Sequence, residues 1–262
     1  MSVRRRAALL LSLLSGFILA SLMADPIAQN PQYHQFADTR QMAGIPFFLN
    51  VLSNVPFTIV GWIGMAFVYR NMNERQVFHD PREAMAWMTA FFGIALIGPG
   101  SAYYHIAPSN ATLLWDRLPM AVGFMGLYAA VLAERVDVDS GVWLLPVLVI
   151  LGVGSVVYWY FTEQAGAGDL RPYAVVQFFP LATIPVMLWL FPARYDGARY
   201  LWRLLILYGV AKGFEYGDAG LFDATGGFIS GHTVKHLTAA IACWFLVGYL
   251  QGRVLPNYST SS

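Results

Sequence analysis

Residues 142–162 read VWLLPVLVILGVGSVVYWYFT and contain no charged side chain. The run is too long for a β-barrel strand and does not alternate between apolar and polar residues. A helix that crosses the hydrocarbon core of a bilayer needs about 20 mainly apolar residues, and this run has that length. The stretch therefore predicts a transmembrane α-helix.

The composition of the whole chain is typical of a membrane protein. Of its 262 residues, 57% are hydrophobic and only 12% are charged, whereas charged residues are what keep a soluble surface hydrated. This balance excludes an ordinary soluble enzyme, a disordered protein and a disulfide-rich secreted module. The net charge of +1 gives no basic excess for nucleic acid, and the single cysteine, Cys243, excludes an intrachain disulfide. We therefore expect a multi-pass membrane protein that binds no nucleic acid.

Eight segments reach or nearly reach the length and hydropathy of a membrane span. They are residues 7–23, 48–69, 84–105, 112–133, 142–162, 173–192, 199–218 and 232–250. The predicted fold class is all-α: a polytopic transmembrane helical bundle with a seven-helix core and one N-terminal hydrophobic helix. We expect residues 1–24 to form a membrane anchor or signal-like helix and residues 25–262 to form one seven-transmembrane domain. No clear cleavage site follows the first segment, which favours an uncleaved helix.

The distribution of arginine and lysine predicts the orientation of the chain. With the N-terminus in the cytoplasm, the inner loops and inner helix ends receive most of the 16 Lys and Arg residues. The short loops and the Arg-rich start are typical of a protein of the bacterial cytoplasmic membrane. We therefore expect an integral, multi-pass protein of that membrane with its N-terminus inside.

Five polar residues lie at the predicted outer ends of three spans. Ser101 and His105 are near the end of 84–105, Asp116 is near the start of 112–133, and His232 and His236 begin 232–250. Ionisable residues inside a membrane are costly and mark functional sites. The spacing of four residues directs both members of each pair, Ser101 with His105 and His232 with His236, to one helix face. The sequence thus predicts one polar cluster towards the outer face.

The three histidines of this cluster are candidate zinc ligands. Neutral imidazoles bind zinc well, and three protein ligands leave a fourth position for water, which is typical of a catalytic site. Zinc lowers the pKa of bound water towards about 7 and so makes it a nucleophile. Asp116 can take the proton and pass it to the leaving group, and Ser101 can donate a hydrogen bond to the developing oxyanion. The predicted reaction is hydrolysis of an amide or ester bond in a membrane lipid.

Each of these residues also has a structural interpretation. A lone intramembrane histidine commonly bonds a neighbouring helix, and a serine commonly packs in a helix interface. Asp116 could pair with Arg117 or cap its helix. The grouping of three histidines with an aspartate at one depth favours metal binding over these alternatives.

Other polar residues are expected to have structural roles. Lys212 and Glu215 are three residues apart and should pair, although Glu215 could also orient a zinc-bound histidine. Lys235 is expected to face away from the two histidines and to extend to the membrane interface. His34 and His79 lie in predicted loops and are expected to be solvated.

The combined motifs resemble the alkaline ceramidase family, whose wider superfamily includes the adiponectin and progestin receptors. They are Asn50-Val-Leu-Ser53-Asn54, Ser101-Ala-Tyr-Tyr-His105, Leu114-Trp-Asp116-Arg-Leu-Pro-Met120 and His232-Thr-Val-Lys-His236, in the family's order. The resemblance runs from span 48–69 to span 232–250, although the middle helices contribute little. It implies a seven-helix bundle with zinc held by His105, His232 and His236, and with Ser101 and Asp116 beside the metal.

The chain departs from this family at the calcium site of the animal enzymes. Phe47 stands where they carry a glutamate three residues before the first-helix asparagine, and only Asp25 and Asp38 are acidic in the preceding segment. These departures put calcium dependence in doubt, and with it the identity of the lipid.

The expected function is therefore that of a zinc-dependent integral-membrane hydrolase. It would cleave the linear amide of ceramide or of a related N-acyl lipid and release a fatty acid, with zinc-bound water as the nucleophile. The alternative is a receptor-like or sensor protein with the same seven helices and a structural zinc. A transporter is disfavoured because the chain shows no internal repeat. The sequence does not indicate the oligomeric state.

Overall fold

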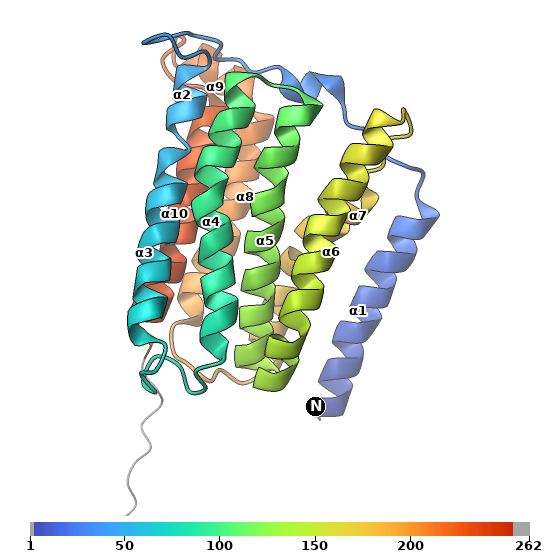
Figure 1. Cartoon of the computed structure of the whole chain (residues 1–262), viewed down its shortest axis with the longest axis vertical. Coiled ribbons are helices and arrows are strands. Elements are labelled where there is room, and N and C mark those ends of the chain that lie inside the picture. Colours follow the sequence, from blue (N-terminus) through green and yellow to red (C-terminus); the bar gives the residue numbers. More distant parts are fainter. Residues whose placement is uncertain (1–2, 254–262) are drawn as a thin grey trace, which may run out of the picture.

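The computed structural model describes residues 3–253, which form a bundle of helices (Figure 1). The long helices are α1 (Val3–Met23), α3 (Val55–Asn71), α4 (Glu83–Ile106), α5 (Asn110–Arg135), α6 (Val138–Gln164), α7 (Arg171–Leu190), α8 (Ala198–Tyr216) and α10 (Gly231–Gln251). The short helices are η1 (Pro31–His34), α2 (Phe48–Leu52) and α9 (Asp218–Ala224). The described residues contain no strand beyond one isolated bridge between Met42 and Ile45. The predicted all-α class is confirmed.

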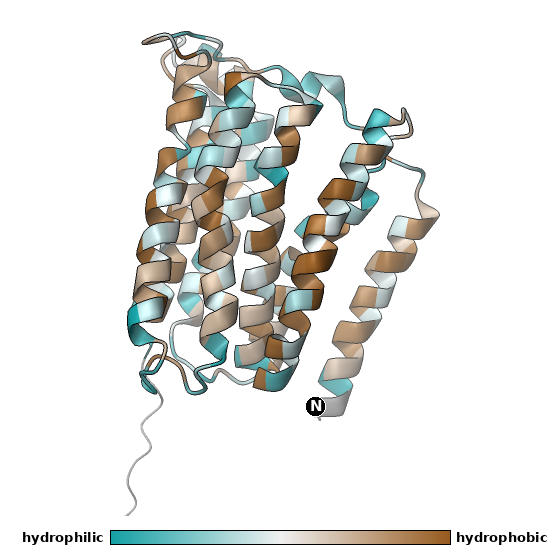
Figure 2. Ribbon diagram, in the orientation of Figure 1, coloured by the Kyte–Doolittle hydropathy of each residue, from teal (hydrophilic) through white to brown (hydrophobic). Residues whose placement is uncertain are grey.

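Seven helices within residues 3–253 are long and apolar enough to cross a membrane. They are α1, the continuous pair α2 and α3, α4, α5, α6, α7 and α10. Hydrophobic residues dominate the middle of these helices, and hydrophilic residues gather at the two ends of the bundle (Figure 2). The chain is therefore an integral, multi-pass membrane protein.

Helix α8 corresponds to the predicted span 199–218 but lies outside this set of seven. Its charged residues, Arg199, Arg203, Lys212 and Glu215, make it more polar than the other long helices. It packs against α10, and only Leu201, Leu204 and Ala211 of its residues are buried (Figure 1). Arg199 and Arg203 near its start are exposed, whereas Lys212 and Glu215 near its end are half-buried and line the cavity described below.

Helix α1 lies at the periphery, as predicted for a hydrophobic helix outside the seven-helix core. It runs beside α7, where Phe17 packs edge-on against Phe179 with ring centroids 5.5 Å apart (Figure 1). Only 6% of the 18-residue apolar stretch of α1 is buried, so most of the surface of this helix is available to lipid.

Glycines set the close spacing of α3, α4 and α5. A Cβ added to Gly98 would lie 1.9 Å from the Thr58 hydroxyl oxygen on α3, and one added to Gly100 would lie 2.3 Å from the Trp115 carbonyl oxygen on α5. This closeness lets the Thr58 hydroxyl donate to the carbonyl of Ala95 at 3.2 Å. That carbonyl needs a donor from outside α4 because Pro99, four residues on, has no N–H. Helix α4 thus continues unbroken through Pro99 to the residues of the site.

Buried ion pairs join the helices at the lower end of the bundle in Figure 1. Glu134 on α5 accepts hydrogen bonds from Trp87 at 2.8 Å and from Tyr249 at 2.7 Å, and it pairs with Arg253. Glu83 accepts one from Tyr195 at 2.7 Å. These contacts connect α4, α5 and α10, and so fix the registers that place the site at the opposite end.

Candidate metal centre and cavity

Three histidines from two helices meet at the upper end of the bundle. His105 comes from the last turn of α4, and His232 and His236 come from the first turns of α10. One ring nitrogen from each lies within 4.8 Å of the other two, and all three residues are buried. The Nε2 atoms of His105 and His232 are 3.3 Å apart. The structure thus brings together the three residues that the sequence predicted as ligands.

The start of α10 is fixed by polar contacts with neighbouring segments. Ser230 caps the helix by accepting a hydrogen bond from the backbone N–H of Thr233 at 3.2 Å. The Thr233 hydroxyl donates to Asn50 on α2 at 2.8 Å. The backbone N–H of His232 donates to the carboxylate of Asp218 on α9 at 2.7 Å. The position of His232 is therefore set by its backbone as well as by its ring.

Ser53 determines which nitrogen of His236 is free. The Ser53 hydroxyl donates its one proton to the carbonyl of Asn50 at 3.0 Å, and its oxygen lies 2.8 Å from His236 Nδ1. With the hydroxyl proton directed to that carbonyl, His236 Nδ1 is the donor of the second contact, and this tautomer leaves Nε2 with a lone pair. A hydrogen bond of this kind is how proteins orient a metal-binding imidazole.

The turn between α4 and α5 positions His105 against Asp116. Ser109 caps α5 in a capping box with Thr112, and the Thr112 hydroxyl donates to the carbonyl of Ala107 at 2.7 Å. The two antiparallel helices then place Ser101 and Asp116 on the wall of one cavity. Asp116 does not pair with Arg117, whose guanidinium donates to Gln29 at 2.6 Å and lies over the Trp159 ring.

The segment before α2 covers the histidines. Phe36 is buried, and its ring centroid lies 4.7 Å from that of His105 and 4.5 Å from that of His232. The next residue, Ala37, donates its backbone N–H to Asp218 at 2.9 Å, so the carboxylate that holds the start of α10 also holds this cover. No sequence pattern pointed to Phe36, because it belongs to an irregular segment without helical periodicity.

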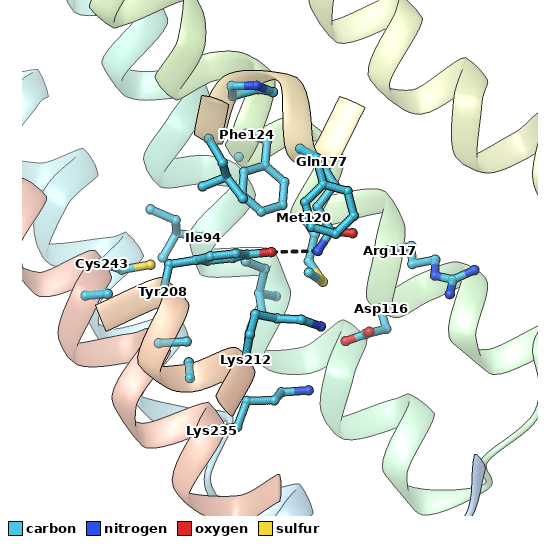
Figure 3. A pocket seen from close by; sticks show the side chains of 18 of the residues that line it. Ile94, Asp116, Arg117, Met120, Phe124, Gln177, Tyr208, Lys212, Lys235 and Cys243 are labelled. Carbon is cyan, nitrogen blue, oxygen red and sulfur yellow. Dashed lines mark hydrogen bonds between the residues drawn. The ribbon is translucent and has the colours of Figure 1, made fainter. Parts of the chain in front are cut away.

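A cavity of about 350 Å³ opens beneath the cluster. The polar residues of its lining include Ser101, Asp116, His236 and Glu215 and the two lysines, Lys212 and Lys235. Asp116 and the two lysines are labelled in Figure 3. Below them the lining is mainly apolar and reaches Leu127 on α5, which at 1.5 Å per residue lies roughly 16 Å along the helix from Asp116. The cavity thus has a polar end and a long apolar part, which we call the apolar shaft. It fits a lipid whose acyl chain lies in the shaft and whose reacting group lies at the polar end.

Two predictions about individual side chains were wrong. Lys235 does not face away from the histidines: its Nζ lies 3.3 Å from His232 Nε2 and 3.0 Å from Glu215 on α8. Three residues at 100° each bring Lys235 within about 60° of His232 around the helix, and Glu215 attracts its charge. His34 is half-buried and not solvated, since its ring nitrogens lie 2.9 Å from the Tyr104 hydroxyl and 2.9 Å from Asn110.

The residues present fit a bound divalent metal. One ring nitrogen of each of three buried imidazoles lies within 4.8 Å of the other two, and the Nε2 atoms of His105 and His232 are 3.3 Å apart. Two neutral imidazole nitrogens that face each other at this distance need a proton or a cation between them. An all-imidazole set is a donor set that zinc prefers.

The comparison with known proteins agrees with this arrangement. A family model described as Ceramidase matches residues 40–214, more than half of the chain. The matched range includes Ser101, His105 and Asp116, while His232 and His236 follow it. No curated protein matches the chain. The matched range, the transmembrane helices and the buried histidines agree, and the chain belongs to the Ceramidase family.

Proposed function

We propose that this protein is a zinc-dependent membrane amidohydrolase that cleaves ceramide or a related N-acyl lipid into an amine and a fatty acid. Family membership supports hydrolysis of ceramide by a membrane enzyme. The observation that carries the finer proposal is the position of the three histidines: they lie at the polar end of a cavity whose remaining lining is apolar. An acyl chain in that shaft would bring its amide to the histidines.

In this proposal the side chains at the polar end of the cavity have different roles in the hydrolysis. A zinc ion held by His105, His232 and His236 would supply Lewis-acid chemistry, lowering the pKa of water and polarising a carbonyl. Asp116 accepts a proton from the attacking water and gives it to the amide nitrogen as the C–N bond breaks. Ser101 lines the same cavity as Asp116, and its hydroxyl is available to donate to the oxyanion.

The proposed topology has the N-terminus in the cytoplasm and the site towards the outer face. The described chain starts at the end of the bundle opposite to the cluster (Figure 1). With an inner N-terminus, a lipid of the outer leaflet would reach the cavity at the depth of its own amide.

The test is hydrolysis by the purified protein with and without its metal. Protein in detergent should release fatty acid from ceramide or N-oleoylethanolamine, lose this activity with 1,10-phenanthroline, and regain it with zinc. A zinc-loaded, folded protein that releases no fatty acid from any N-acyl lipid would contradict the proposal. If such an inactive protein also had a lower melting temperature after its metal was removed, the receptor-like alternative with a structural zinc would gain support.

We expect the activity to be independent of calcium. Asp38 is the acidic residue near the site in the segment before α2. It is buried, and the Arg40 guanidinium donates a hydrogen bond to its carboxylate at 2.7 Å. Burial alone would raise the pKa of Asp38, but the hydrogen bonds and charge of Arg40 outweigh it and lower the pKa below its usual value. The carboxylate is thus ionised at neutral pH and already neutralised, which leaves little charge for calcium. The calcium chelator EGTA should leave the rate unchanged in zinc-loaded protein, and stimulation by millimolar calcium would contradict this expectation.

A further inference from the structure

The only two lysines of the chain lie together at the polar end of the cavity. The 16 basic residues include 14 arginines, and the two lysines are Lys212 and Lys235. They come from different helices, α8 and α10, and both line the cavity. Figure 3 shows both amino groups extending towards Asp116, whereas the Arg117 guanidinium points in the other direction. We call Lys212 and Lys235 the lysine pair.

One carboxylate serves both amino groups. Glu215 pairs with Lys212 through one oxygen and with Lys235 Nζ through the other, at 3.0 Å. Apart from Arg117, whose guanidinium points away and donates to Gln29, the charged residues of the lining are two lysines and two carboxylates, Asp116 and Glu215. Among the described residues, neither lysine forms an ion pair with Asp116, so both amino groups share the one carboxylate of Glu215. A charged group that is incompletely paired inside a membrane bundle is costly, and an anionic ligand would complete the pairing.

The ammonium groups also have unused hydrogen-bond capacity. Each can donate three hydrogen bonds, and among the described residues Lys212 has only Glu215 as a partner. Lys235 has Glu215 and the ring of His232. The Lys212 side chain is 43% exposed and that of Lys235 is 19% exposed, so Lys212 is the more accessible of the two. The pair thus forms a donor-rich patch beside the histidines.

The position of Lys235 limits how far this patch lies from the reacting bond. Its Nζ is 3.3 Å from His232 Nε2, one of the nitrogens of the histidine cluster. A group bound by Lys235 must therefore lie within a few covalent bonds of the amide that the cluster would act on. The hydroxyl groups of ceramide carry no charge and would form weaker hydrogen bonds to the two ammonium groups than an anion would.

We propose that the lysine pair binds an anionic group, a carboxylate or a phosphate, attached close to the amide nitrogen of the substrate. This inference rests on the proposed function and narrows its substrate class from N-acyl lipids in general to acidic ones. The acyl chain occupies the apolar shaft, and the amide lies below the histidines. The acidic head group then faces Lys235 and Lys212.

Two matched lipid pairs test the inference on the zinc-loaded protein. N-oleoylglycine and N-oleoylethanolamine differ in a carboxylate, and ceramide 1-phosphate and ceramide differ in a phosphate. The acidic member of at least one pair should have a kcat/KM about tenfold higher or more, as expected for hydrogen bonds between charged groups. The pair with the larger ratio identifies the acidic group.

Variants of Lys212 assign the preference to this residue. Lys212→Met should bring the ratio close to one, mainly by raising KM for the acidic lipid, because Glu215 keeps Lys235 as its partner. Lys212→Arg should restore much of the ratio. Arg199→Met is the matched control, because it removes a cation from the other end of α8, away from the cavity. An unchanged ratio in Lys212→Met would overturn the inference.

A labelling measurement separates failure of this inference from failure of the proposed function. Amine-reactive labelling followed by mass spectrometry reads Lys212 and Lys235 individually, since the chain has no other lysine. N-oleoylglycine should slow the labelling of both, and N-oleoylethanolamine should not. Equal protection by both lipids, or faster hydrolysis of the neutral lipids, would overturn the anion site while the amidohydrolase stands. Selective protection without any hydrolysis would support the anion site and contradict the hydrolase.

Discussion

Replacing His236 by alanine is expected to remove the bound metal and the hydrolytic activity together. The wild-type protein should contain about one zinc per chain, held by three imidazoles, and two ligands hold such an ion far less tightly than three. His236 is the most informative of the three because Ser53 fixes its Nδ1 proton and so directs Nε2 to the cluster. Zinc measured by mass spectrometry in detergent-purified His236→Ala should fall close to zero, and fatty acid release should fall to background.

The matched control for this variant is His79→Ala. His79 is exposed in the loop before α4, at the other end of the bundle, so its removal should change neither zinc content nor rate. Circular dichroism should show the same helix content in both variants. A His236→Ala protein that is folded, free of zinc and still active would contradict the metal site.

Asp116→Asn should separate catalysis from metal binding. The carboxylate lies beside the histidines and is not one of the three ligands, so the variant should keep its zinc. An amide cannot accept the proton of the attacking water, and the loss of a general base typically lowers the rate by about 10²–10⁴-fold. The fall should be seen in kcat, measured with saturating lipid, since the shaft that binds the acyl chain is unchanged.

Asp223→Asn is the control for this second variant. Asp223 is an exposed carboxylate on α9, outside the cavity, and its amide should support the wild-type rate. If Asp116→Asn retained full turnover, the assignment of the proton transfer to Asp116 would be wrong. If it instead lost zinc, Asp116 would have to be a ligand.

The main elements of the site could be predicted because they follow from helix geometry. The spacing of four residues places His232 and His236 on one face whatever surrounds them, and the short break at Pro108 makes α4 and α5 antiparallel neighbours. The lengths of the apolar segments predicted the membrane spans. Because successive spans run in opposite directions, His105 and Asp116 were expected at the same end of the bundle. These inferences need no knowledge of which helix packs against which.

The residues that the sequence missed depend on contacts between distant segments. Phe36 covers two histidines only because its segment is held by Asp218, which lies 182 positions further along the chain. Lys235 turns towards the site because Glu215 of α8 lies opposite, and hydropathy alone favoured a role at the membrane interface. His34 is held by Tyr104 and Asn110, so a histidine in a loop became part of the packing.

The dependence of the site on α10 has a consequence for how the protein is made. A ribosome synthesises the chain from its N-terminus, and membrane helices assemble as they emerge. His105, Asp116 and most of the cavity are in place before two of the three ligands exist, since His232 and His236 belong to the last helix, which packs against α2, α3 and α8. On the proposed function, a partly synthesised chain would therefore lack two of the three ligands. Lipid hydrolysis would then begin only after the last of these helices has packed, and incomplete chains would leave the surrounding bilayer intact.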